Sequence, residues 1–212
     1  MSTYDPYDPY KQEFSPAEGS SSPLMPRSPL TFLPARLAVA ASLLGLAACN
    51  PTFNWRDVRP DGTALSLLLP CKPDKAEKKV PLGDRPVTMR LLGCDAGDAT
   101  FALAVADVGD ASKVAAVLAQ WQSGTLANMK APPAGRLSNG IATEVLPLKL
   151  PGAALQPPAV LVKATGQRAD GSAVRGQAAY FVQGTQVFQA VMYAAEIKPE
   201  VAETFFSSLK FE

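Results

Sequence analysis

The chain has 212 residues, a formal net charge of +1 and an apolar content of 47%. This length suits one domain plus a leader, and a charge near zero gives no electrostatic reason to expect a nucleic acid partner. The sequence contains no histidine, which removes the commonest general base near neutral pH and the commonest metal ligand. We therefore expect no histidine-based catalytic arrangement, and an enzyme made from this chain would rely on carboxylates, lysines or tyrosines. Because the sequence also shows no recognisable catalytic constellation, we expect no metal site, no cofactor and no enzymatic activity.

A weakly polar to apolar run of twelve residues, 37–48 (LAVAASLLGLAA), leads directly into Cys49. It is too short to span about 30 Å of hydrocarbon as a helix, which takes about 20 residues. Its length is typical of the hydrophobic region of a signal peptide, and Arg27 and Arg36 supply the positive flank. The alternative is a buried helix that contains a cysteine. It is disfavoured because Asn50-Pro51 interrupts the helical pattern.

The end of this run, Leu46-Ala47-Ala48-Cys49, resembles the lipobox of bacterial lipoproteins. The resemblance implies that residues 1–48 are removed and that Cys49 receives diacylglycerol and an amide-linked chain such as palmitate. That number of chains is sufficient for stable anchoring. In that family an aspartate after the cysteine favours retention in the inner membrane. Asn50 is not aspartate, so the resemblance implies an anchor in the outer membrane, on its periplasmic side.

The first 24 residues do not fit a signal peptide, since they carry four acids against one lysine where positive charge is expected. Met25 opens a stretch of the right charge and leaves a signal peptide of ordinary length, residues 25–48. We hypothesise that Met25 is the true start of the protein. A peptide from residues 1–24 recovered from the native cell would contradict this. The alternative is a genuine disordered tail built on the Tyr-Asp-Pro repeat.

We expect residues 49–53 to form a short tether and residues 54–212 to form one globular α+β domain. Apolar patterning in its first half predicts strands over 65–69, 78–82, 86–93 and 100–107. A tight turn centred on Asp84 should join the second and third strands. In the fourth strand the alternation predicts Phe101, Leu103 and Val105 on one face and small residues on the other.

A helix is predicted next, with Asp110 or Ser112 as its N-terminal cap and Pro132-Pro133 as its end. Its apolar face consists of residues at helical spacing: Val114, Val117, Leu118, Trp121, Thr125, Leu126 and Met129. A tryptophan on such a stripe is more typical of a core than of a ligand contact.

The second half predicts strands over 141–150 (interrupted at Pro147), 159–168, 173–183 and 186–194. Asp170-Gly171 and Gly184-Thr185 are typical of two-residue hairpin turns, and the second turn would place Phe181 opposite Phe188. A short helix is expected from Pro199, with Val201, Phe205 and Leu209 in one apolar row.

This order predicts an antiparallel sheet of meanders with one long central helix and a short C-terminal helix packed on it. The pattern resembles the Mog1/PsbP-like domains. Leu65 to Pro70 (LSLLLP) is similar to their opening strand, and Phe205 to Leu209 (FFSSL) to the end of their last helix. The resemblance spans nearly all of residues 53–212 and brings no shared catalytic residues. It implies an accessory, assembly or binding role.

Cys71 and Cys94 are the cysteines that remain once Cys49 is acylated. An even pair in an exported domain predicts a disulfide. A turn centred on Asp84 would set residue 94 opposite residue 74, with Cys71 just beyond that end of the ladder. Two buried free thiols are the alternative. A redox role is less favoured because the spacing is not Cys-x-x-Cys.

Charged residues that could carry chemistry occur in three places. Asp95 and Asp98 could contribute to a calcium site, but such a site needs six or more oxygen ligands, so a polar turn is favoured. Glu144 could pair with either of them as catalytic carboxylates, although nothing in the sequence brings them together. Four lysines could touch anionic lipid or protect a strand edge: Lys72, Lys75, Lys78 and Lys79.

Two classes of function follow. The favoured one is a lipid-anchored, non-catalytic envelope protein that binds a protein partner or assists assembly. The alternative is a small-ligand-binding protein, or a carboxylate-based hydrolase, with a cleft between the sheet and the helix over 110–129. A deep pocket with converging carboxylates would favour the second class, and a shallow surface with an apolar patch the first.

Overall fold

The computed structural model describes residues 52–83, 85–135, 137–138 and 141–212. The leader, Cys49, Asn50 and the centre of the predicted turn, Asp84, lie outside these residues, so the structure does not test the predictions made for them.

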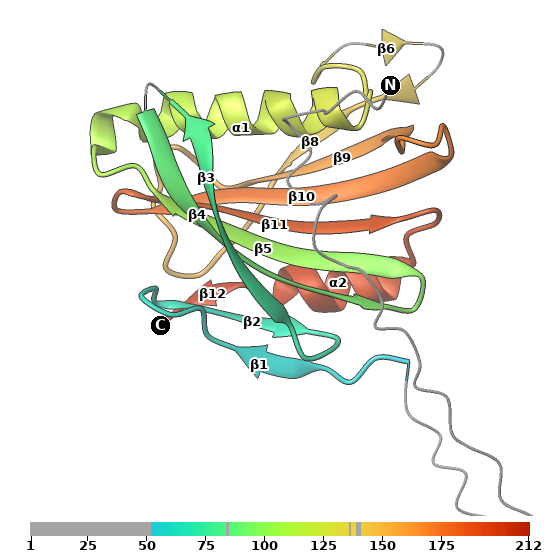
Figure 1. Cartoon of the computed structure of the whole chain (residues 1–212), viewed down its shortest axis with the longest axis horizontal. Helices are drawn as coiled ribbons and strands as arrows, with labels where there is room; N and C mark the ends of the chain where they lie inside the picture. The colour runs from blue at the N-terminus through green and yellow to red at the C-terminus, as the bar shows by residue number, and fades with distance from the viewer. Residues whose placement is uncertain (1–51, 84, 136, 139–140) are drawn as a thin grey trace, which may run out of the picture. The chain divides into compact units, whose positions relative to one another are not determined.

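Seven strands form an antiparallel sheet in the order β3-β4-β5-β11-β10-β9-β8 (Figure 1). Their bounds are Asp74–Leu82 (β3), Arg85–Ala96 (β4), Ala99–Asp107 (β5), Glu144–Pro147 (β8), Val160–Gln167 (β9), Ala173–Gln183 (β10) and Gln186–Ala194 (β11). Two meanders, one from each half of the domain, meet where β5 pairs with β11. Together with two α-helices, this sheet confirms the α+β class.

The LSLLL segment does not belong to this sheet, contrary to the prediction of a single set of meanders. Leu65–Leu69 is β2, the centre of a separate three-stranded sheet between β1 (Arg56–Val58) and β12 (Lys210–Phe211). The two flanking strands are too short to carry a pattern of their own. A further small hairpin consists of β6 (Leu137–Ser138) and β7 (Ile141–Ala142).

The predicted helices are confirmed. The Asp110 side chain accepts a hydrogen bond from the Ser112 backbone N–H at 2.9 Å and caps a short 3₁₀ turn, η2 (Ala111–Lys113). This turn continues into α1 (Val114–Asn128). The C-terminal helix α2 spans Pro199–Ser207, with its proline in the first turn.

Strand β5 shows why the sheet is covered on both sides. Phe101, Leu103 and Val105 lie in one core cluster, with α2 and the small sheet. The alanines between them lie in the other cluster, with α1. We call these the phenylalanine face and the alanine face. The predicted alternation is thereby confirmed, and each face is buried under a different part of the chain.

Small residues let α1 approach the alanine face closely. At the end of the helix, the Met129 carbonyl accepts a hydrogen bond from the Gln167 N–H at 2.7 Å. A Cβ atom on Gly166 would lie 2.0 Å from that carbonyl oxygen, and one on Gly176 would lie 2.7 Å from the end of the Met129 side chain. Gly166 is therefore required by close packing, because the obstacle there is backbone, whereas at Gly176 the end of the Met129 side chain would have to shift.

Aromatic rings fill the phenylalanine face. Phe181 and Phe188 pair across β10 and β11, as predicted, with stacked rings 5.1 Å apart. Phe211, from the last strand, meets both edge-on. Phe205 of α2 meets Phe101 edge-on at 5.3 Å. The C-terminal segment thus completes this half of the core.

Two predicted turns are wrong in detail. Leu82 pairs with Arg85, so Asp74 lies opposite Gly93 rather than residue 94. The register is one residue away from that of a turn centred on Asp84. At Asp170-Gly171 the N–H of Gly171 donates to the Arg168 carbonyl, and Arg168 also pairs with Ser172. This is a three-residue loop with glycine in the left-handed position (φ 86°), a common alternative to the two-residue turn.

Gly166→Ala should destabilise the protein by about 2 kcal/mol or more, because the new methyl group overlaps backbone at the end of α1. Gly124→Ala is the matched control. It lies inside α1 with nothing within 4 Å of its added Cβ, so it should stabilise the helix by up to about 1 kcal/mol. Denaturant unfolding of the two variants measures both effects, and equal midpoints would contradict the packing argument.

Candidate functional site

The domain is packed from its first described residues onward. The Phe53 ring stacks on Trp55 at 5.9 Å, and Trp55 meets Phe101 edge-on at 6.1 Å. Between them the Asn54 N–H donates to the Pro70 carbonyl at 2.8 Å. A Cβ on Gly97 would lie 2.5 Å from the Phe53 ring. Phe53, the last residue of the predicted tether, is therefore packed against the core on the phenylalanine face.

The turn against which the Phe53 ring packs joins β4 to β5. Ala96 pairs with Ala99, and Gly97 and Asp98 both have positive φ, 56° and 61°. This is the requirement of a type I′ turn. Asp95 accepts a hydrogen bond from the Thr100 hydroxyl at 2.6 Å. The structure therefore places Asp95 and Asp98 at an exposed hairpin tip, and the described residues contain no metal-binding group of three or more histidine, cysteine or acidic side chains.

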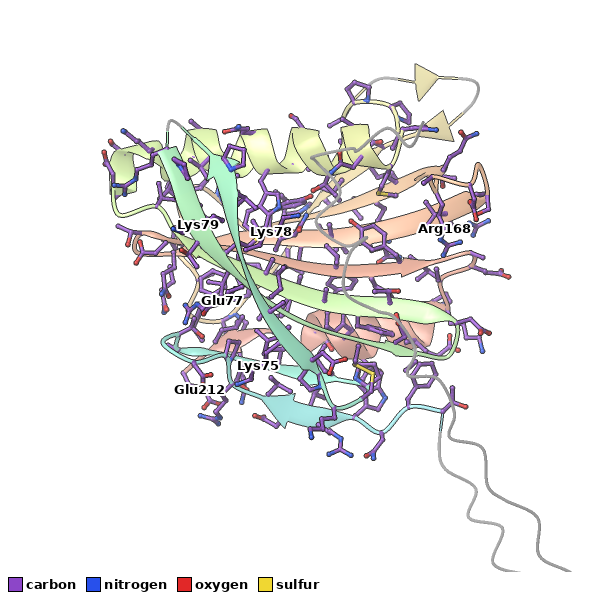
Figure 2. The ribbon with its side chains drawn as sticks, viewed as in Figure 1. Lys75, Glu77, Lys78, Lys79, Arg168 and Glu212 are labelled. Atoms are coloured by element: carbon purple, nitrogen blue, oxygen red, sulfur yellow. A yellow bond between two sulfur atoms is a disulfide. The ribbon has the colours of Figure 1, made fainter. Side chains whose placement is uncertain are left out.

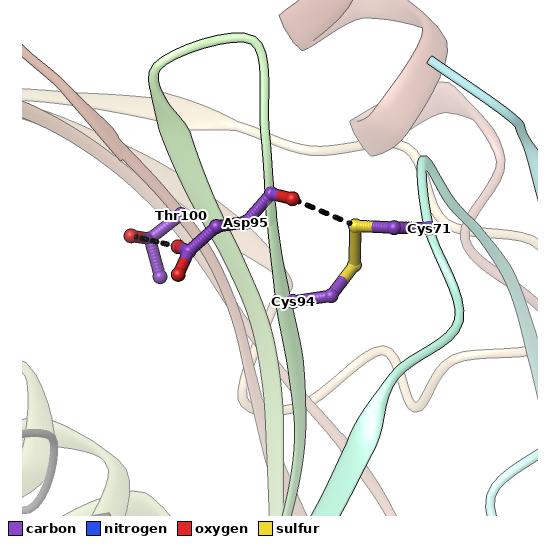
Figure 3. Close-up of a disulfide and its surroundings, with 4 residues drawn as sticks. All are labelled: Cys71, Cys94, Asp95 and Thr100. Atoms are coloured by element: carbon purple, nitrogen blue, oxygen red, sulfur yellow. Dashed lines mark hydrogen bonds between the residues drawn. A yellow bond between two sulfur atoms is a disulfide. The ribbon is translucent and has the colours of Figure 1, made fainter. Parts of the chain in front are cut away.

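A disulfide lies beside this turn (Figure 3). Cys71 and Cys94 are bonded, with their Cα atoms 6.1 Å apart, which confirms the predicted pair. Cys94 is 8% exposed, and the Cys71 sulfur lies 3.4 Å from the Asp95 carbonyl oxygen. The bond links the segment after β2 to β4 and so joins the small sheet to the large one. Closing a loop of 23 residues is worth about 3 kcal/mol on the chain-entropy model.

The lysine cluster lies along the edge of the large sheet (Figure 2). Lys75, Lys78 and Lys79 are exposed on β3, whose one partner in the sheet is β4. Glu77 lies between them, opposite Arg90 of β4. Exposed lysines on an edge strand discourage pairing with another chain, so this strand has the character of a protected, solvated edge.

A shallow cleft lies between this edge and the β1–β2 connection, with a volume of about 180 Å³. Lys75 pairs with Asp61 at 2.9 Å, and this hydrogen bond holds the pKa of the Asp61 carboxyl below its usual range. The Arg90 guanidinium donates to the backbone carbonyl of Asp61, and the Gln186 amide donates to that of Gly62 at 3.0 Å. These contacts fasten the connection to the sheet and already engage the carboxylate of Asp61.

Glu144 lies on β8, at the opposite edge of the sheet from the lysines. Three strands separate β8 from β5, which at about 4.8 Å per strand places their axes about 19 Å apart. The structure therefore does not bring Glu144 together with Asp95 or Asp98. Beside Glu144, Val145 and Leu146 are 43% and 38% exposed, a small apolar feature on a four-residue edge strand.

Comparisons with known proteins do not identify a family for this chain. No family model matches the chain, and no curated protein matches it. Among solved structures, it is similar to PA94 from Pseudomonas aeruginosa, a protein of unknown function that has been suggested to be a regulator. The identity is 17% and the TM-score 0.31, over 66% of this chain and 82% of that one.

A buried polar group beneath α1 was not predicted from the sequence. The Gln189 amide donates hydrogen bonds to the hydroxyl groups of Thr125 and Tyr180, both at 2.8 Å. Burial raises the pKa of Tyr180 to about 12. Gln189 and Tyr180 are each 1% exposed and Thr125 is half-buried, so this group lies mostly out of solvent and ties the helix to the sheet. A glutamine within an otherwise apolar strand was the one available signal.

Alkaline pH should lower the free energy of unfolding through Tyr180. The ordinary pKa of a tyrosine hydroxyl is about 10, and burial raises that of Tyr180 to about 12 in the folded protein. Above about pH 10 the unfolded state therefore holds fewer protons than the folded one. The stability from the protonated hydroxyl is complete below pH 10 and is lost as the pH rises toward 12, at most about 2–3 kcal/mol.

Denaturant unfolding between about pH 9 and about pH 11 measures this loss. Tyr180→Phe removes the titrating group while keeping the ring, so its stability should depend less steeply on pH in that window. An equal dependence in the two proteins would contradict the assignment.

Proposed function

We propose that this protein is a lipoprotein of the bacterial envelope, anchored in the outer membrane through acylated Cys49. Its periplasmic domain is of the Mog1/PsbP-like type. It binds a protein partner or assists assembly, and it is not an enzyme. The observation that carries the proposal is the position of the lipobox immediately before the packed domain. Phe53, four residues after Cys49, already packs against the core. Cleavage before Cys49 therefore leaves every described helix and strand intact.

A binding role is supported by what the charged residues already do. The carboxylate of Asp61 in the shallow cleft is paired with Lys75. Glu144 lies across the sheet from Asp95 and Asp98. Tyr180, whose pKa is raised to about 12, is sealed beneath α1. Tyr180 lacks the exposure of a general acid or base, and the exposed carboxylates lack the arrangement of a catalytic pair.

The space that the alternative function requires is filled. Four residues of α1 are buried against the alanine face: Val114, Val117, Leu118 and Leu126. A ligand cleft between the sheet and this helix would require their displacement.

No helix within the described residues is long and apolar enough to cross a bilayer.

Metabolic labelling with palmitate tests the anchor. We expect the native protein to be labelled and to float with outer membranes. Cys49→Ser should abolish the label, because the serine hydroxyl cannot form the thioether. The double variant Cys71→Ser/Cys94→Ser is the matched control and should keep the label, since those cysteines are bonded to each other.

Asn50→Asp should move the labelled protein to the inner membrane, as the lipoprotein resemblance implies. A native protein that takes up no palmitate, or a Cys49→Ser variant that is still labelled, would refute the anchor.

A further inference from the structure

We infer that the end of the domain formed by Phe53 and the Gly97-Asp98 turn rests against the headgroup layer of zwitterionic phospholipid. In this orientation the β10–β11 turn faces away from the bilayer. The inference rests on the proposed acylation of Cys49. It goes further because it names the surface that meets the membrane.

The tether between the proposed anchor and the domain is short. Two residues separate Cys49 from Thr52. An extended chain spans at most about 3.6 Å per residue, so the Cα atom of Thr52 lies within about 11 Å of that of Cys49. The first described residue must therefore stay close to the lipid headgroups.

Phe53 is packed against the rest of the domain. A tether lets the domain rotate only through residues that make no contact with the domain. Phe53 is not such a residue, because it lies between Trp55 and Gly97. The next residue, Asn54, is hydrogen-bonded to Pro70. The short tether therefore holds one particular surface of the domain near the membrane, the end bearing the β4–β5 turn.

The chemistry of this end suits zwitterionic headgroups. Asp95 and Asp98 expose carboxylates at the turn, and Lys72 is exposed beside the disulfide. Both signs are thus present, as they are in a headgroup that carries an ammonium and a phosphate. A purely anionic surface would repel the carboxylates of Asp95 and Asp98 at this turn.

The opposite end of the sheet lies well away from this surface. Ala194 pairs with Ala99 at the turn end, and Gln186 pairs with Asp107 at the other. Eight residues of strand separate these pairs, which at about 3.4 Å per residue is about 27 Å. The β10–β11 turn, Gly184-Thr185, follows directly from the second pair.

The two tryptophans of the chain are natural reporters of this orientation. Trp55 contacts Phe53 and belongs to the phenylalanine face. Trp121 belongs to α1 on the alanine face, across the sheet. One helical turn after Trp121, Thr125 reaches Gln189, whose partner on β5 is Ala104. That position is seven residues from Gly97, about 23 Å along the strand.

The experiment uses the full processed lipoprotein in phosphatidylcholine vesicles that contain a small fraction of dansyl-labelled phosphatidylethanolamine. Trp121→Phe leaves Trp55 as the donor, and Trp55→Phe leaves Trp121. We expect severalfold greater energy transfer to the dansyl headgroup from Trp55. Circular dichroism checks that each variant is folded, and phenylalanine preserves an aromatic ring at both positions.

Equal transfer from the two donors, or greater transfer from Trp121, would overturn the orientation while leaving the anchor in place. No transfer from either donor, with the protein remaining unbound to the vesicles, would overturn the anchor itself. A flexible ten-residue Gly-Ser insertion between Pro51 and Thr52 should reduce the difference between the donors. An undiminished difference would refute the role of the short tether.

Discussion

Burial of both faces of the central strands β5 and β11 is the constraint on which the rest of the fold depends. Antiparallel sheets commonly leave one face to solvent, but nearly every residue of these two strands is buried. Two separate covers are therefore required. Helix α1 covers the alanine face, where small side chains allow a close approach. The small sheet, α2 and Phe211 cover the phenylalanine face, where the rings need a wider layer.

The second cover is assembled from both ends of the domain, and this explains where its cross-links lie. β2 comes from the N-terminal end, and it pairs with β12 from the C-terminal end. The Leu68 N–H donates to the Ser208 hydroxyl at 2.9 Å, which joins the small sheet to the end of α2. The Cys71–Cys94 bond then joins the same layer to β4. Segments so distant in sequence form a cover only when such contacts hold them against the large sheet.

Local patterns in the sequence predicted the elements that bury themselves by their own periodicity. The alternation over 100–107, the helical spacing up to Met129 and the Phe181–Phe188 pair are of this kind. What could not be predicted depends on distant partners. β1 and β12 are strands because β2 offers an edge to each of them. The cleft near Asp61 and the buried contact of Gln189 with Tyr180 exist only once separate segments are packed together.

In the proposed orientation, Phe53 both packs against the core and keeps the domain close to the membrane. Its ring is one of the partly buried groups that cover the phenylalanine face, next to Trp55 and against Gly97. Releasing it would lengthen the tether and would also expose the aromatic surface that it covers. Full burial of such a ring is worth about 1.5–3 kcal/mol. The partly buried Phe53 ring contributes a fraction of this, so a longer tether comes at a cost in stability. The packing that completes the core is therefore the same packing that keeps the domain close to its anchor.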